Sequence, residues 1–269
     1  MSVTDDVYTH GHHDAVLRSH RWRSAENSAG YLLAHLRSGL ALLDVGCGPG
    51  TLTADLARRV APGEVLGIDV ASEVVGEAEA HAASSGVDNV SFQAGDFRTA
   101  GLGRASFDVV HAHQVVQHLS DPVGALAAMV RLARPGGLVA VRDSDYAAMT
   151  WAPADAGLDR WMNLYQQVTR HNGAEPNAGR HLVGWARQAG LVDLTYTTST
   201  WTFATRADRA WWADLWAERV VGTRFADQAV AYGLAMPADL AAIAAAWRAW
   251  AAADDAVFVV LHGELLARV

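Results

Sequence analysis

Leu43-Asp44-Val45-Gly46-Cys47-Gly48-Pro49-Gly50 is the stretch of sequence that decides the fold. It overlaps a short apolar run, Ala41–Val45, which predicts a buried β-strand, and its glycines predict a tight turn into a helix that begins at Thr51. At such a junction a ligand can approach the glycine backbone closely and meet the N–H groups of the first helical turn. The stretch therefore predicts a ligand site at the carboxyl end of a strand.

Outward from this loop, short apolar runs alternate with amphipathic segments as far as residue 145. The expected strands are Ala41–Val45, Val65–Asp69, Val90–Ala94, Phe107–Ala112 and Leu138–Arg142, and the expected helices between them are Thr51–Val60, Ser72–Ser84 and Pro122–Ala133. Alternation at this spacing predicts βαβ units, and therefore a parallel sheet with helices on both faces.

The flanking segments have a different character. The expected elements there are a helix over Ser24–Arg37, a helix over Arg180–Ala189, a strand over Leu191–Phe203, an alanine-rich helical stretch over Asp208–Ala253 and a last strand over Val257–His262. Of the ten tryptophans, Trp22 precedes the αβ alternation and the other nine follow residue 150. Such a late segment either forms an aromatic-lined compartment or fixes a helical cap to the sheet.

Together these patterns predict an α/β fold with a doubly wound, mostly parallel, seven-stranded sheet. The expected divisions are an N-terminal helical lid (1–39), an α/β core (40–204), a helical cap insertion (205–254) and a last strand that returns to the core sheet (255–269).

Composition narrows the classes of function. The net charge is −8 and every one of the 21 basic residues is arginine, so there is no global basic field for nucleic acid and no lysine for a Schiff base or a phosphate loop. No apolar run reaches the length of a membrane span, and the acidic N-terminus does not resemble a signal peptide. With Cys47 as the only cysteine, we expect no intramolecular disulfide and a cytoplasmic location.

Acidic residues follow three of the predicted strands. Asp44 precedes the first glycine of the loop by two residues, where a carboxylate would repel a pyrophosphate and favour a cationic ligand. Asp69 ends the second strand, where a carboxylate can accept both hydroxyls of a ribose. Asp96 follows the third strand and could accept from an adenine amino group, although a Gly-Asp pair is also common in simple turns. Thr51 occupies the position where the dinucleotide-binding fingerprint has a glycine or alanine, so the loop does not match that fingerprint.

A family resemblance rests on the whole set of motifs. Asp44–Gly50, Gly67-Ile68-Asp69, Gly95-Asp96-Phe97 and Phe107–Gln114 resemble the successive motifs of class I methyltransferases, in particular the subgroup of ubiquinone and menaquinone biosynthesis. The resemblance covers about residues 40–200, and Tyr8–Arg23 is similar to a narrower group. That group contains fungal enzymes that methylate thiols of dithiol-bridged diketopiperazines and actinobacterial small-molecule relatives.

The resemblance implies a Rossmann-like methyltransferase fold and S-adenosylmethionine as the cofactor, which carries a sulfonium and no phosphate. The cofactor-binding residues that it implies are Asp44, Gly46, Cys47, Gly48 and Gly50 beside the methionine portion, Asp69 and Val70 at the ribose, Asp96 and Phe97 at the adenine, and His113 along the methionyl group. Arg23 is either a partner of the methionyl carboxylate or a solvated residue at a helix end. The first alternative follows because a cation that binds both oxygens stabilises a buried carboxylate.

The resemblance and the residues together predict methyl transfer to a nitrogen, sulfur or oxygen atom of a small natural-product-like molecule. Alternatives are a catalytically idle subunit that binds the cofactor and an NAD-type oxidoreductase, the latter disfavoured by Asp44 and Thr51. Partners other than the small-molecule acceptor, such as nucleic acid or a membrane, are not expected, and the sequence is silent on oligomeric state.

Residues that act on the acceptor are harder to identify. A base is needed only if the acceptor loses a proton, and Tyr8, His12 and His13 are the candidates, with His113, Asp143 and Asp145 left open. Trp151, Tyr165 and Arg170 are candidate substrate contacts, because loops at strand ends surround such a site; for Trp212 and Trp216 core packing is expected. The histidines of the sequence match no familiar zinc spacing, so we expect no metal.

Overall fold

One mixed β-sheet organises the chain. The computed structural model describes residue 6, residue 9 and residues 14–269. The strands are β1 (Leu42–Val45), β2 (Val65–Asp69), β3 (Val90–Ala94), β4 (Phe107–His113), β5 (Ala133–Ser144), β6 (Thr150–Ala152), β7 (Asp193–Phe203) and β8 (Val257–Arg268). They lie in the order β3-β2-β1-β4-β5-β8, with β6 and β7 both paired to β8. β1 to β5 are parallel to one another, and β8 is antiparallel to all its partners.

The predicted fold class is confirmed, but the prediction of seven strands was wrong. The extra strand is β6, which pairs with β8 beyond the point where β5 ends. β8 is long enough for this because it continues to Arg268 instead of ending at His262. Glu264, two residues beyond the expected end, lies within the sheet, where Arg142 on β5 pairs with it at 3.2 Å.

The helices follow the sequence closely in the αβ half. They are α1 (Asp14–Arg21), α2 (Ala25–Ser28), α3 (Gly30–Leu33), α4 (Thr51–Val60), α5 (Ser72–Ser84), α6 (Pro122–Leu132), α7 (Ala156–His171), α8 (Ala178–Gln188), α9 (Arg206–Gly222), α10 (Arg224–Ala231) and α11 (Pro237–Ala251). The single helix expected over Ser24–Arg37 is instead α2 and α3. Ser24 caps α2 by accepting from the Asn27 N–H, and the chain turns at Ala29 before Gly30.

Alternating residues of the strands pack against opposite helical layers. Leu42 and Val109 join the core under α2, α3 and α4, whereas their neighbours Leu43 and Val110 join the core under α6 and α8. This two-residue period, with both sets buried, is why the strands appear in the sequence as continuous apolar runs.

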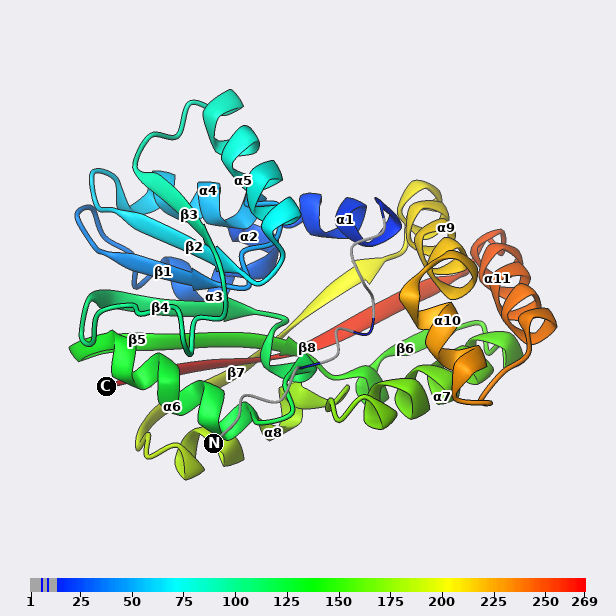
Figure 1. Ribbon diagram of the computed structural model, residues 1–269. Helices are drawn as coiled ribbons and strands as arrows, with labels where there is room; N and C mark the ends of the chain where they lie inside the picture. The colour runs from blue at the N-terminus through cyan, green and yellow to red at the C-terminus, as the bar shows by residue number, and fades with distance from the viewer. Residues whose placement is uncertain (1–5, 7–8, 10–13) are drawn as a thin grey trace.

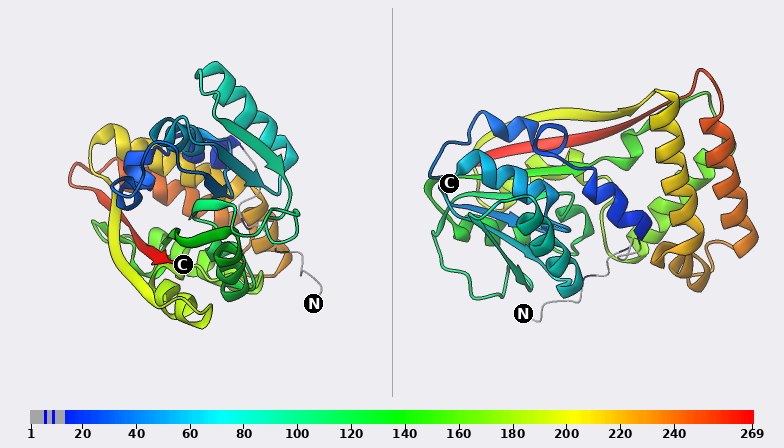
Figure 2. Two further views of the ribbon diagram at one scale, coloured as in Figure 1. Left: turned by 90° about the vertical axis from the view of Figure 1, so that its left-hand side faces the viewer. Right: turned by 90° about the horizontal axis from the view of Figure 1, so that it is seen from above.

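A second, aromatic core lies beyond the sheet. β7 and β8 run out of the sheet toward α9, α10 and α11, and α7 packs against the same helices (Figure 1). Their buried aromatic side chains form one cluster, which includes Trp161, Tyr165, Trp216, Trp247 and Phe258. α1 lies between the αβ core and α9 (Figure 2) and contacts both α4 and α9. The space below α1 is therefore bounded by two separate cores.

Candidate active site

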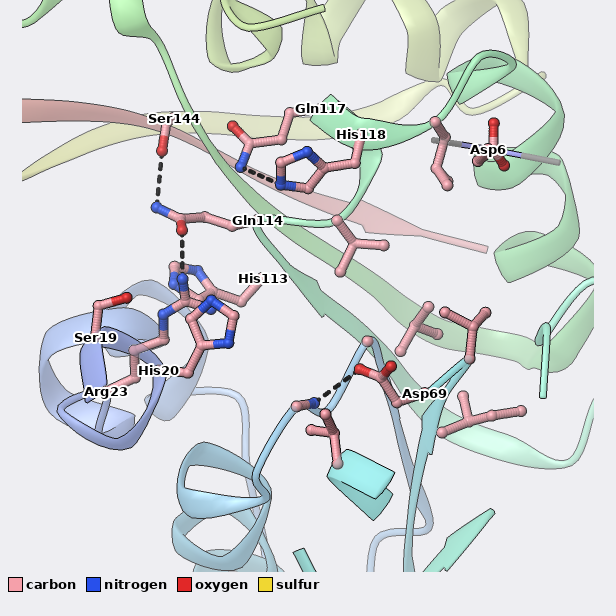
Figure 3. Close-up of a pocket in the computed structure, with 18 of the residues that line it drawn as sticks. Asp6, Ser19, His20, Arg23, Asp69, His113, Gln114, Gln117, His118 and Ser144 are labelled. Atoms are coloured by element: carbon pink, nitrogen blue, oxygen red, sulfur yellow. Dashed lines mark hydrogen bonds between the residues drawn. The ribbon is translucent and has the colours of Figure 1, made fainter. Parts of the chain in front are cut away.

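A cavity of about 460 Å³ lies along the carboxyl ends of the parallel strands. Its walls come from the loops after these strands, from α1 and the residues just after it, and from α9. Figure 3 shows Asp69 on one side of the cavity and His20, Arg23, His113 and Gln114 gathered on the other. Ligands of open α/β sheets bind at this edge, so the cavity lies where the glycine loop predicts a ligand site.

The glycine loop between β1 and α4 presents bare backbone to this cavity. Gly46, Gly48 and Gly50 have φ values of 67°, 54° and 76°, a left-handed conformation that glycine adopts without steric cost. A Cβ atom at Gly50 would lie 2.7 Å from the Cβ of Ala78. Gly46 and Gly48 line the cavity directly, so a ligand can approach the loop without meeting a side chain there.

Asp44 lies beneath the loop instead of in the main cavity. Its carboxylate is buried, accepts from the Thr53 hydroxyl at 2.6 Å and contacts His111 Nδ1 at 2.7 Å. It borders a smaller cavity of about 20 Å³ that Arg23 and Cys47 also line, and burial raises the pKa of the Cys47 thiol. Because the protein engages both oxygens of Asp44, its influence on a ligand is mainly electrostatic.

Asp69 stands at the end of β2 with its carboxylate facing the cavity (Figure 3). One oxygen accepts from the Gly48 N–H at 3.0 Å and the other from the Ala71 N–H at 3.1 Å. These bonds fix the carboxylate, and each oxygen keeps capacity for a further donor. Val70, next in the chain, lines the same part of the cavity and is 71% exposed.

Asp96 and Phe97 line the cavity beside Asp69, but Asp96 also has a partner that the sequence did not indicate. Arg98 binds both oxygens of Asp96, at 2.7–3.0 Å, and donates to Asp6 at 2.7 Å. Asp6 in turn accepts from the N–H and the hydroxyl of Ser120. Burial alone would raise the pKa of Asp6, but the hydrogen bonds from Ser120 and Arg98 hold it below its usual value.

Arg23 reaches the opposite side of the cavity through Gln114. It donates to the Gln114 Oε1 at 2.6 Å, and the Gln114 Nε2 lies 2.7 Å from the Ser144 hydroxyl and 2.8 Å from His262 Nε2. Gln114 itself has φ of 54°, a conformation uncommon for a residue other than glycine. The side chain of Gln114 therefore links the N-terminal segment to β5 and β8 at the edge of the cavity.

His113 ends β4 and lines both cavities. It is 4% exposed, and neither ring nitrogen has a hydrogen-bond partner within the described part of the chain. Burial, followed by the charges of Arg23 and Arg142, lowers its pKa well below 6.5. The imidazole is thus neutral, and it lines the cavities with both ring nitrogens unpaired among the described residues.

The end of the cavity farthest from Asp96 is aromatic. Tyr146 and Met149 follow β5, Trp201 lies on β7, and Trp212 and Trp216 lie on α9. Trp212 and Trp216 also belong to the aromatic core, so their expected packing role is confirmed, and both border the cavity although they are almost fully buried. Arg219, whose guanidinium lies 5.1 Å from the Trp216 ring, is the charged residue of this end.

The proposed substrate contacts Trp151, Tyr165 and Arg170 do not line either cavity. Trp151 stacks on Phe258 with ring centroids 5.7 Å apart, and Tyr165 is fully buried behind Tyr146, with ring centroids 4.0 Å apart. Arg170 pairs with Glu175 at 3.8 Å on the surface. A loop after β5 does reach the site, as expected, but through Tyr146 and Met149.

The candidate bases Tyr8, His12 and His13 lie outside the described residues. Within residues 6, 9 and 14–269, no group of histidine, cysteine and acidic side chains has the arrangement of a metal site. No helix of the same part of the chain has the length and apolar character to cross a membrane.

Two of the cavity residues that were not predicted could have been found from their positions in the sequence. Gln114 and Tyr146 follow the ends of β4 and β5, and strand ends were already the positions where ligand contacts were sought. Trp201 had no such signal, because it lies inside a strand and not after its end, and it reaches the cavity only because β7 extends beyond the sheet.

Comparison with known proteins agrees with this geometry. Residues 36–194 match the methyltransferase domain family. An uncharacterised methyltransferase of Schizosaccharomyces pombe is 30% identical over 98% of this chain and 97% of its own length. A ubiquinone biosynthesis O-methyltransferase of Methylococcus capsulatus is 33% identical over 60% of this chain and 67% of its own. The crystal structure of the YcgJ protein of Bacillus subtilis shares the fold, with a TM-score of 0.56 and 20% identity over 89% of this chain and 96% of that one.

The residues at the cavity suit S-adenosylmethionine. Asp69 and Asp96 are acceptors for hydroxyl and amino groups, and Gly46 and Gly48 leave room beside them. The carboxylate of Asp69, which faces the cavity beside the glycine loop, would disfavour a pyrophosphate there. This chain belongs to the methyltransferase family and is an S-adenosylmethionine-dependent methyltransferase of the Rossmann-like fold.

Proposed function

We propose that the protein transfers a methyl group from S-adenosylmethionine to a nitrogen, sulfur or oxygen atom of a small, aromatic or apolar, natural-product-like molecule. One observation carries the proposal: a single cavity extends from the carboxylates of Asp69 and Asp96 to the aromatic side chains of Tyr146, Trp201 and Trp216. A methyl donor at the first end would present its methyl group toward the second. Aromatic walls favour a flat, largely apolar acceptor.

The cavity supports an orientation of the cofactor along the sheet edge. In this proposal Asp96 and Phe97 hold the adenine, Asp69 and Val70 the ribose, Gly46 and Gly48 the methionine portion, and Arg23 the methionyl carboxylate. The order of the strands supports the same sequence of contacts, because β3, β2, β1 and β4 are successive neighbours. The reacting methyl group would then lie near β4, and the acceptor beside β5, β7 and α9.

Binding measurements test the cofactor half of the proposal. We expect calorimetry to detect saturable binding of S-adenosylmethionine and S-adenosylhomocysteine and none of NAD. Binding of NAD without a response to either of the other compounds would favour an oxidoreductase and overturn the proposal.

Transfer of a labelled methyl group tests the acceptor half. The labelled cofactor is incubated with a panel of aryl thiols, phenols, aryl amines and, for comparison, aromatic hydrocarbons without a heteroatom. We expect label in one of the first three classes, and Trp216→Ala to reduce transfer at least about tenfold because it removes an aromatic wall. Trp185→Ala is the matched control, because Trp185 lies on α8 away from the cavity. Cofactor binding without transfer to any compound would favour the idle subunit.

A further inference from the structure

His113 is a buried side chain whose hydrogen-bonding groups are left for something other than the protein. Both ring nitrogens lack a partner among the described residues, although the side chain is 4% exposed. An unmet buried donor or acceptor costs about 1–3 kcal/mol. An imidazole at the wall of a cavity, with neither ring nitrogen hydrogen-bonded to the described residues, is therefore in a position to form a hydrogen bond with a ligand.

The position of His113 along the sheet edge indicates which part of the ligand it meets. β4 lies between β1, which carries the glycine loop, and β5, which leads to Ser144 and Tyr146. Neighbouring strands are about 4.8 Å apart, so His113 is one strand from the proposed methionine portion and one from the aromatic end. Its ring lies 5.7 Å from the ring of Trp201, centroid to centroid. His113 is thus at the boundary between donor and acceptor.

The groups packed around His113 keep it neutral. Arg23 comes from the N-terminal segment, Arg142 from β5, His262 from β8 and His111 from β4 itself, and each disfavours a proton on His113 in addition to the effect of burial. Arg142 is partly neutralised by Glu264. A neutral imidazole has one nitrogen lone pair that can accept a hydrogen bond or a proton.

We propose that His113 is the catalytic residue that accepts the proton of the acceptor's nucleophilic O–H or S–H group during methyl transfer. The proposal rests on the function proposed above. The nucleophilic oxygen or sulfur forms a bond to the methyl carbon, the bond from that carbon to the cofactor sulfur breaks with its electron pair going to sulfur, and the proton moves to the ring nitrogen. The products are the methylated acceptor, S-adenosylhomocysteine and an imidazolium, which returns its proton to solvent.

The charges in the site make this route consistent with a weakly basic histidine. Before transfer the cofactor carries the positive sulfonium, and His113 beside it is neutral. After transfer the sulfur is neutral and the positive charge is on His113. The number of positive charges near Arg23 and Arg142 therefore does not change, and the sulfur no longer carries a positive charge that would repel a protonated His113.

Nitrogen NMR of the ring tests the contact without turnover. Protein labelled at histidine is saturated with S-adenosylhomocysteine, and 2-naphthol or its methyl ether is added; the His113 signals are identified by their loss in His113→Asn, or in His113→Gln if the first variant does not fold. We expect 2-naphthol to shift one ring nitrogen of His113 and the methyl ether, which has no O–H group, to leave both unchanged. Equal responses to the two compounds, or bound 2-naphthol with no response, would overturn the proposal.

A second measurement distinguishes proton acceptance from a structural role. Initial rates are compared for 2-naphthol and for 4-nitrophenol, which is far more acidic and is largely ionised before it binds. We expect His113→Asn to slow transfer to 2-naphthol by about a hundredfold and transfer to 4-nitrophenol by much less. His35→Asn is the control, because His35 is exposed and away from the cavity.

The two proposals fail in different ways. If His113→Asn slowed transfer to both phenols equally, His113 would not be the proton acceptor, but the proposed function would stand. The same holds if His12→Asn or His13→Asn, and not His113→Asn, slowed transfer to 2-naphthol more than transfer to 4-nitrophenol. If wild-type protein bound S-adenosylhomocysteine but neither bound nor methylated any aromatic compound, the proposed function itself would be wrong.

Discussion

At the scale of single residues, Asp143 shows how burial alone changes the state of a carboxyl group. It lies on β5 and is fully buried, and it accepts a 3.4 Å hydrogen bond from the Gln117 N–H. Burial raises its pKa well above 3.8, and the backbone hydrogen bonds and nearby arginines offset only part of this. It lines neither cavity, so it is a poorer candidate for a base than its place at the end of β5 suggested.

We expect Asp143→Asn to stabilise the protein at neutral pH. A raised pKa in the folded state means that the unfolded chain ionises Asp143 first, so stability falls as the pH rises above 3.8. The asparagine removes this loss and keeps an acceptor for the Gln117 N–H. Urea denaturation should show a gain of at least about 1 kcal/mol at pH 7 and little difference near pH 4. A gain of equal size at both pH values would contradict the proposal that Asp143 is protonated in the folded protein. Asp193→Asn, at an exposed position, is the control.

Asp69 carries the most direct prediction about the cofactor. Replacing it with alanine removes the acceptor for the ribose hydroxyls, the bond from Gly48 in the glycine loop and the bond from Ala71 before α5. We expect the Kd of S-adenosylhomocysteine, measured by calorimetry, to rise more than about tenfold, since each bond to a charged group contributes about 1.5–3 kcal/mol. The same substitution at the exposed Asp88 should leave the Kd unchanged. An unaltered Kd for Asp69→Ala would remove Asp69 from the ribose site.

The placement of these acids could be predicted because it follows from one rule of parallel sheets. Asp69 and Asp96 follow neighbouring strands, and the carboxyl ends of parallel strands lie at one edge. The partners of a carboxylate could not be predicted in the same way. Arg98 is two residues from Asp96, but its bidentate contact depends on Asp6, which is far away in the chain.

At the scale of elements, α1 joins parts of the protein that the sequence keeps far apart. Arg18 pairs with Glu218 on α9 and Arg21 pairs with Glu77 on α5 at 2.8 Å. The Thr51 hydroxyl, at the start of α4, donates to the backbone carbonyl of His20 at 3.1 Å. α1 therefore covers the cavity from above while it contacts both cores, in keeping with the lid that we propose for residues 1–39.

We expect Asp6→Ala to weaken closure over the adenosine end of the cavity. The substitution removes the bonds to Ser120 and to Arg98, the residue that holds Asp96. The loss of such a charged contact corresponds to about a tenfold higher Kd for S-adenosylhomocysteine. Stopped-flow measurements should assign most of the change to faster dissociation. Glu73→Ala, at the start of α5, is the control. If Asp6→Ala left the dissociation rate unchanged, Asp6 would have no role in holding the lid closed.

The helices around the aromatic core show why element prediction was uneven. α4 and α5 alternate with strands and have the bounds that were predicted, whereas α7 was missed although Asp155 caps its first turn and Trp161, Leu164, Tyr165 and Val168 recur at helical spacing. Those apolar side chains pack against α9, α11 and the outer end of β8, beyond the αβ alternation, so the αβ pattern gave no reason to expect them. We propose that the cap consists of α7 together with α9–α11. Its first helix, α7, then lies within residues 40–204, the range that was expected for the α/β core.

At the scale of the whole molecule, the fold joins a conventional α/β core to a cap through two long strands. The buried parts of β7 and β8 carry polar groups as well as apolar ones: Glu264 pairs with Arg142, whose guanidinium lies 5.0 Å from the centroid of the Trp201 ring. The class of the fold follows from alternation in the sequence. The cavity does not, because its aromatic end exists only where the cap meets the sheet edge.

Several titratable groups are buried in this region, and their protonation links stability to pH. Burial lowers the pKa of His118 to about 3 and places those of His113 and His262 well below 6.5. Unfolding below the ordinary histidine pKa therefore takes up three protons at these positions. Asp143 acts in the opposite sense, because the folded state already holds its proton. The net uptake is about two protons between pH 6 and pH 4.5.

We therefore expect the free energy of unfolding to fall by about 3 kcal/mol for each pH unit below 6, since each proton contributes about 1.4 kcal/mol per unit. The sign follows because a histidine with a lowered folded-state pKa stabilises the fold only above its unfolded pKa. Urea denaturation at several pH values measures the slope. His262→Asn, which keeps an acceptor for Gln114, should reduce the slope by about half, whereas exposed His35→Asn should not change it. A stability that is flat between pH 6 and 4.5 would mean that these histidines gain protons inside the folded protein, and the neutral state argued for His113 would then be wrong as well.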